Sequence, residues 1–317
     1  MISLIKQNAG KTALIVLLFL WIGSLLAQPA PIELVKEFGL FSVLGVIGAI
    51  FANATGAGGG VVFVPFFNYL SFSAQSVVAT SFAIQCCGMT AGALTWAAYY
   101  KHQHKYDQYW KALPSVLMLT VPSSICGIGF AQYSSQSTRL LEHLWGGANN
   151  LHIAFGSFSI LLAIAIFASI PLMKRTHFKK DLHTKDLLLL PFIGFLGGII
   201  TAWLSVGVGE LVAVYLIIRG FNVTLSIASA VILSAVTVWS ALPYHAFISE
   251  SVVWQVVLFA GAGAIVGGTI AKFVVLAFSV QRLKLFFGMW VLILEAGRFK
   301  KKVKLFRGLY RKKFQIS

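Results

Sequence analysis

The chain has 317 residues, of which 58% are hydrophobic and 11% are charged, and its mean hydropathy is +0.85. Because a soluble domain carries about 25% charged residues, a water-soluble fold is excluded and membrane spans of about 20 residues become the expected unit. The net charge of +16 does not predict a nucleic-acid partner, because nine of the bases lie in the acid-free tail at 296–317, where they indicate topology and binding to anionic lipids.

Apolar segments follow one another along the whole chain. Residues 12–27 predict a retained span, with a cleaved signal peptide as the alternative, and together with a linker they form an N-terminal unit at 1–37. The next apolar segments are 38–100, 113–133 and 151–173, then 187–218, 223–247, 252–278 and 283–294. This pattern predicts an all-α, polytopic helical membrane protein with about eight or nine transmembrane segments. A basic loop at 174–186 divides them into halves at 38–173 and 187–295, and the basic tail follows.

The two halves match each other when one is shifted by 149 residues. Without a gap, this shift places Gly45 on Gly194, Gly48 on Gly197, Gly58 on Gly207 and Gly60 on Gly209. Four matches in register predict an internal duplication. Isolated glycines, such as Gly45 and Gly194, are expected only to let helices pack closely.

Two arrangements in the bilayer fit these segments. If each apolar unit crosses once, the loops at 28–37, 101–111, 174–186 and 248–251 share a side with the tail, and that side holds eighteen of the 25 bases. If 38–70 and 187–218 are instead helical hairpins that enter and return, the halves are an inverted pair and the tail lies outside. Basic loops favour the cytoplasm, so charge counting favours single crossings with a cytoplasmic tail.

Both halves contain a segment that cannot be one straight helix. Residues 38–70 would span about 50 Å, whereas the hydrocarbon core is about 30 Å thick. The run Asn53-Ala-Thr-Gly-Ala-Gly-Gly-Gly60 predicts a break, and Ser205-Val-Gly-Val-Gly-Glu210 repeats it more weakly. Unwound backbone at membrane depth lines cavities, and paired broken helices indicate the substrate site of a transporter. Their restarting N-termini would offer amide groups to an anion, although close helix packing is the simpler explanation of the glycines.

Polar residues near the breaks are candidates for contacting that anion. The predicted substrate-binding residues are Asn53, Thr55, Gly56, Gly58, Gly59, Gly60, Thr80, Ser81, Gln85, Ser205, Gly207, Gly209 and Ser229. Glu210 is the one clearly deep carboxylate and predicts proton coupling, since a protonated Glu210 would not compete with an anionic substrate. Its alternatives are a plain helix-cap acid or a partner for Arg219. His245, near the end of a span, is expected to be an interfacial residue.

The cluster Gly56-Ala57-Gly58-Gly59-Gly60, followed by Pro65 and Ala79-Thr80-Ser81, with Gly207-x-Gly209 in the other half, resembles the TauE/SafE family of membrane permeases. The resemblance covers roughly residues 38–295. It implies a transporter of small organic or sulfur-containing anions, such as sulfite or a sulfonate, in the bacterial cytoplasmic (inner) membrane. The second half has Glu210 where the first has Val61, so the half-sites are not equivalent.

Other functions fit the sequence less well. An enzyme would need clustered acids, histidines or an activated nucleophile, so no catalytic residues, metal site or cofactor are predicted. A channel, or a transporter of another small solute, is the alternative. The sequence does not predict an oligomeric state.

Overall fold

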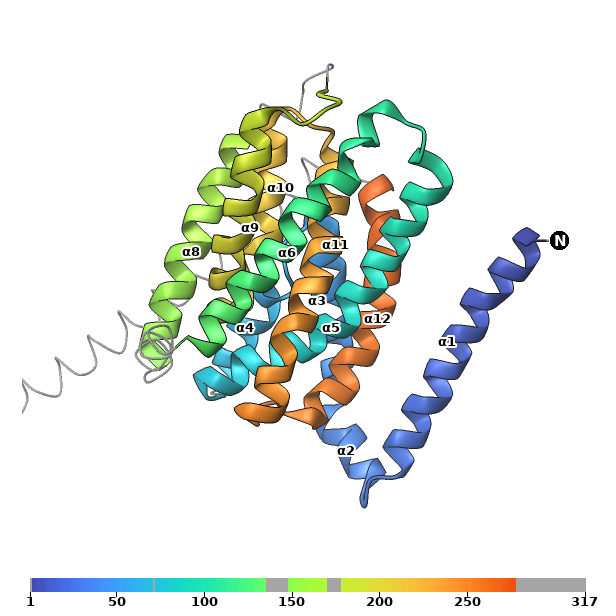
Figure 1. Ribbon diagram of the computed structural model, residues 1–317. Coiled ribbons are helices and arrows are strands. Elements are labelled where there is room, and N and C mark those ends of the chain that lie inside the picture. The colour runs from blue at the N-terminus through green and yellow to red at the C-terminus, as the bar shows by residue number, and fades with distance from the viewer. Residues whose placement is uncertain (1, 71, 135–147, 170–177, 278–317) are drawn as a thin grey trace, which may run out of the picture.

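We analysed a computed structural model, which describes residues 2–70, 72–134, 148–169 and 178–277. Every regular element within these residues is a helix. In chain order they are α1 (Ile2–Leu26), α2 (Pro31–Phe38), α3 (Phe41–Thr55), α4 (Gly60–Tyr69), α5 (Ala74–Tyr99), η1 (Tyr100–His104), η2 (Gln108–Trp110), α6 (Ala112–Tyr133), α8 (Ala148–Ser169), α9 (Thr184–Leu204), α10 (Val208–Arg219), α11 (Val223–Pro243), η4 (Tyr244–Ile248) and α12 (Trp254–Ala277). Most of them form one bundle. Toward its N-terminus α1 diverges from the bundle (Figure 1), whereas near its C-terminal end Trp21 Nε1 donates a hydrogen bond to the Leu258 carbonyl oxygen of α12 at 2.8 Å.

The helical membrane architecture predicted from composition is confirmed. Five described helices are long and apolar enough to cross a bilayer, or six if the bent pair α1 and α2 is counted as one span. The predicted total of eight or nine stays a prediction. The apolar unit at 283–294 and the basic tail at 296–317 lie outside the described residues.

Helices α3 and α4 form a hairpin that enters the bundle and returns. The ring of Phe41, at the start of α3, lies 6.3 Å from that of Phe66 and 6.1 Å from that of Phe67, both on α4. In the middle of the hairpin, a Cβ on Gly48 would lie only 2.6 Å from the Phe63 ring. Contacts at both levels require α4 to run back along α3.

Helices α9 and α10 form a second hairpin, which is closed by a buried ion pair. Asp186 lies in the first turn of α9, and its Oδ1 accepts hydrogen bonds from Arg219 Nε and from Tyr215 Oη of α10, each at 2.6 Å. The backbone N–H of Lys179 donates to the Gly220 carbonyl oxygen at 2.9 Å. The end of α10 therefore returns to the start of α9.

The single-crossing arrangement favoured by charge counting is consequently wrong. Gly56 (φ 75°) and Ser205 (φ 60°), which lie 149 residues apart, adopt the left-handed conformation that ends each first helix and turns the chain. A hairpin returns to the side from which it came. The segments at 28–37 and 248–251 therefore do not share a side with the 101–111 loop.

Helices α5 and α11 cross the centre of the bundle in opposite directions. The Phe82 ring on α5 stacks on His245 just beyond α11, with centroids 5.1 Å apart, and further along α5 Thr90 Oγ1 accepts a hydrogen bond from Trp239 Nε1 at 2.8 Å. Both helices start on a side chain that caps their first turn. Ser73 accepts from the Ser76 N–H at 3.1 Å, and Asn222, 149 residues later, accepts from the Thr224 N–H at 2.9 Å.

Small residues join each hairpin to a helix of the other half. Cβ atoms on Gly45 and Gly263 would overlap the backbone across the α3–α12 contact, and Gly194 and Gly198 allow the same closeness between α9 and α6. The packing role predicted for the isolated glycines is confirmed.

The two hairpins enter the bundle from opposite ends. We call these the α2 end, with Phe41, Ser73 and residues 249–253, and the α9 end, with residues 100–111 and 178–183 (lower and upper in Figure 1).

Candidate functional site

The two hairpin tips meet inside the bundle. We call residues 56–60 the first tip and residues 205–209 the second tip. In the first, Thr55 Oγ1 accepts a hydrogen bond from the Ala57 N–H at 3.2 Å, and in the second, Thr201 Oγ1 accepts from the Val208 N–H at 2.9 Å. These hydroxyls satisfy amides that the broken helices leave unpaired, so the tips are ordered turns.

Glu210 connects the tips to each other. Its Oε1 accepts a hydrogen bond from the Gly58 N–H at 2.7 Å, and its Oε2 accepts from the Gly207 N–H at 3.0 Å. The side chain lies in the first turn of α10 and the residue is 3% exposed. The helix-cap role considered from the sequence is therefore present, but the same carboxylate also bonds to the opposite half. Arg219 pairs with Asp186 and not with Glu210.

Gln85 holds the second tip from the side of α5. Its Nε2 donates to Ser81 Oγ at 3.0 Å, to Ser205 Oγ at 2.8 Å and to the Ser205 carbonyl oxygen at 3.1 Å. Ser205 Oγ in turn donates to Ser81 Oγ at 3.0 Å. Gln85 Oε1 is buried without a hydrogen-bond partner, and a Cβ on Gly58 would lie 2.9 Å from it. The site thus has a neutral polar wall with one unused acceptor.

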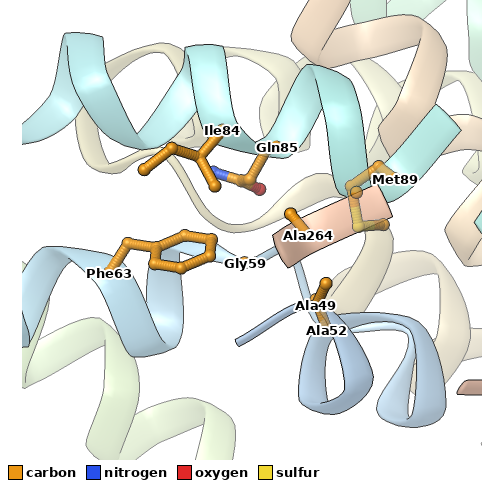
Figure 2. Close-up of a pocket in the computed structure, with 9 residues that line it drawn as sticks. Ala49, Ala52, Gly59, Phe63, Ile84, Gln85, Met89 and Ala264 are labelled. Carbon is orange, nitrogen blue, oxygen red and sulfur yellow. The ribbon is translucent and has the colours of Figure 1, made fainter. Parts of the chain in front are cut away.

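Glycine is required where the tips touch. A Cβ on Gly60 would overlap the Ser205 carbonyl group, and one on Gly209 would lie 2.5 Å from the Gly56 carbonyl oxygen. Beside Gly59, a gap is lined by side chains that include Phe63, Ile84 and Gln85 (Figure 2). The gap is too narrow to admit a water molecule, and residues 56–60 and 205–210 are all buried, so the site is closed in this conformation.

Comparison with known proteins identifies the family. The model of the family described as Sulfite exporter TauE/SafE matches residues 40–296, which is most of the chain. The chain belongs to this family. TauE/SafE proteins are membrane transporters of sulfur-containing anions, and the family is not one of enzymes. Comparisons with curated proteins and with solved structures gave no match.

This TauE/SafE chain brings most of the predicted site residues together, but not all. Thr55, Gly56, Gly58, Gly59, Gly60, Ser81, Gln85, Ser205, Gly207, Gly209 and Glu210 lie at the two tips or contact them. The other three predicted residues, Asn53, Thr80 and Ser229, form no hydrogen bond to either tip. Asn53 Nδ2 donates to the Ala49 and Gly88 carbonyl oxygens, which ties α3 to α5. Thr80 Oγ1 accepts from the Val253 N–H at the α2 end, and Ser229 Oγ is buried without a hydrogen-bond partner.

Some residues of this transporter were underestimated from the sequence. Ser234 lies 149 residues after Gln85 and contacts the second tip at Gly209, as Gln85 contacts the first tip. His245 lies near the end of its span as expected, but its side chain is fully buried against Phe82 and does not face the membrane interface. Ser234 is one of the deep polar residues that the sequence offers as a neutral hydrogen-bonding group, and the repeat offset pairs it with Gln85. No pattern along the chain indicated that α5 and η4 would meet at His245.

No metal centre accompanies the tips in the described part of the TauE/SafE chain. The described residues contain no group of three or more histidine, cysteine, aspartate or glutamate side chains that could hold a metal ion. The tips and the adjoining residues of α5 and α10 instead bring together two backbone amides, two serine hydroxyls, a glutamine amide and one carboxylate. Neutral donors of this kind hold an oxyanion without a permanent positive charge.

Proposed function

We propose that this protein is a secondary transporter that carries sulfite or a small sulfonate through a site between the two hairpin tips. One observation supports this most directly. The N–H groups of Gly58 and Gly207, from opposite halves, converge on one carboxylate at the centre of the bundle. A sulfur oxoanion presents oxygens of the same kind to the same pair of donors. Glu210 then serves as the carrier of a coupled proton.

The arrangement of the halves supports alternating access. Two related halves of opposite direction, with discontinuous helices that meet near the middle, are the plan of many secondary transporters. Here the hairpin breaks and the caps of α5 and α11 recur 149 residues apart, which supports the duplication predicted from the glycines. We propose that rocking one half against the other opens the closed tips to each side in turn. A channel would instead need a continuous pore.

We further propose that the α9 end faces the cytoplasm. At the α2 end, the described part of the bundle has one basic residue, Lys36. The described bases in and next to the loops of the α9 end are Lys101, Lys105, Lys111, Lys179, Lys180, Lys185 and Arg219. Because basic residues stay on the cytoplasmic side, this distribution favours a cytoplasmic α9 end. The predicted binding of anionic lipids by the basic tail concerns residues outside the described part.

Cysteine labelling tests this orientation. In a variant whose native cysteines are replaced, we would place one cysteine at Ile32, which is 71% exposed near the α2 end, or at Tyr106, which is 90% exposed at the α9 end. We expect a membrane-impermeant maleimide to label Ile32→Cys on intact cells and Tyr106→Cys only after permeabilisation. The reverse pattern would place the α9 end outside.

Flux measurements test the function itself. We would reconstitute the purified protein in liposomes and measure uptake of sulfite, a small sulfonate and acetate, each with and without an imposed pH gradient. We expect gradient-driven movement of the sulfur oxoanions and little movement of acetate. A flux that does not depend on the imposed pH gradient would contradict proton coupling. If neither sulfite nor the sulfonate is transported, the proposed substrate is wrong.

A further inference from the structure

The Glu210 carboxylate occupies the place that the proposed function assigns to the substrate. Each of its oxygens takes one tip amide, from Gly58 at 2.7 Å and from Gly207 at 3.0 Å. Around it, Gly60 and Gly209 touch the backbone of the opposite tip so closely that a single Cβ would not fit. The closed site therefore already contains one anionic group and has no room for a second.

The charge on this carboxylate is balanced by backbone dipoles and not by a base. The ion pairs found among the described residues join His104 to Asp107, Lys111 to Asp181 and Arg219 to Asp186, and none includes Glu210. Apart from Glu210 itself, the described titratable groups on α4, α5, α9, α10 and α12 are Tyr69, Cys86, Cys87, Tyr99, Lys185, Asp186, Tyr215, Arg219 and Lys272. No hydrogen bond joins any of these side chains to Glu210. An entering anion would thus face an unneutralised like charge across a poorly polarisable interior.

From this geometry we infer that Glu210 is an internal competitor of the substrate, which locks the two hairpins together until a transported anion takes its place on the Gly58 and Gly207 amides. The inference rests on the proposed function and assigns a regulatory role within the same site. The substrate and the ionised side chain occupy the amides alternately. A proton on Glu210 releases the amides, and loss of that proton expels the anion and closes the tips.

This role predicts that binding and transport change in opposite directions when the carboxylate is removed. Residues that bind substrate directly lose affinity when they are truncated. A competitor instead lowers the apparent affinity for the substrate, because only the molecules whose amides are free can bind it. We expect Glu210→Ala to bind methanesulfonate at least about tenfold more tightly than the wild type at pH 7.5, because the wild-type amides are then mostly occupied. Gradient-driven flux should be lost, because nothing then expels the anion.

Titration calorimetry on the purified full-length protein, combined with liposome flux, tests the inference. Methanesulfonate is the probe because its charge does not change over the pH range used. Wild-type affinity should rise as the pH falls, whereas Glu210→Ala and Glu210→Gln should bind with an affinity that does not depend on pH. Glu37→Gln, which removes an exposed carboxylate from α2, is the matched control and should behave as the wild type.

The outcomes separate this inference from the proposed function. Affinity in Glu210→Ala that is equal to or weaker than that of the wild type overturns the competitor role. Glu210→Gln keeps the size of the side chain, so it decides the question if the alanine variant does not fold. If neither the wild type nor any variant binds methanesulfonate or sulfite, the proposed anion site itself is wrong.

Discussion

Replacing Gly60 by alanine is expected to abolish transport while the protein still inserts into the membrane. The new Cβ would overlap the carbonyl group of Ser205 and lie 3.3 Å from its Cβ, and backbone at a packed tip cannot yield as a flexible side chain does. The tips would have to move apart, and the Gly58 and Gly207 amides would no longer converge. Since misplacement of binding groups by about 1 Å costs about 100-fold, we expect a flux decrease of that order.

A matched alanine substitution controls for general effects on the helices. Gly129 lies on α6, and a Cβ there would have no atom within 4 Å. Gly129→Ala should therefore keep wild-type flux in the same liposomes, with equal amounts of protein verified by size-exclusion chromatography. Correctly folded Gly60→Ala protein that transports sulfite at the wild-type rate would remove the tip contact from the mechanism.

Replacing Asp186 by asparagine is expected to cause the largest loss of stability. Asp186 is fully buried and accepts hydrogen bonds from Arg219, from Tyr215 and from the His183 N–H, which join the two ends of the second hairpin. Removing the charge leaves Arg219 without its partner at a half-buried position. Breaking a buried ion pair costs about 3 kcal/mol, and we expect a clearly lower midpoint of thermal unfolding in detergent.

An exposed ion pair provides the comparison for Asp186. Asp181 pairs with Lys111 at 3.1 Å, but their side chains are 67% and 71% exposed, so Asp181→Asn should change the midpoint little. In addition, the double variant Asp186→Asn, Arg219→Gln should be more stable than Asp186→Asn alone, because no unpaired charge remains. Equal midpoints for Asp186→Asn and Asp181→Asn would show that the hairpin does not depend on this ion pair.

The glycine pattern predicted where the helices break but not what the chain does there. Gly56 to Gly60 and Gly207 to Gly209 indicated the breaks because several glycines together disfavour a helix. The turn back at Gly56 and Ser205 depends on a left-handed residue and on contacts such as Phe41 with Phe67, which lie far apart in the sequence. Counting each broken unit as one crossing then reversed the predicted side of 28–37 and 248–251.

The sequence alone also could not rank the individual glycines at the first tip. It placed Gly59 and Gly60 together as candidates, whereas the structure distinguishes them. A Cβ on Gly59 would meet the side chains of Phe63 and Gln85, but one on Gly60 would meet the backbone of the opposite half. This difference arises from packing between segments about 145 residues apart, so no local pattern contains it.

By itself, the sequence determined that the protein is a helical membrane protein of the TauE/SafE type, with a break in each half and a carboxylate, Glu210, beside the second break. These features follow from hydropathy and glycine placement, which are properties of the chain alone. The tertiary structure decided that the broken helices are hairpins from opposite ends, and that Glu210 accepts hydrogen bonds from both tips. Both depend on which distant segments come into contact, and that is fixed only when all the helices pack against one another.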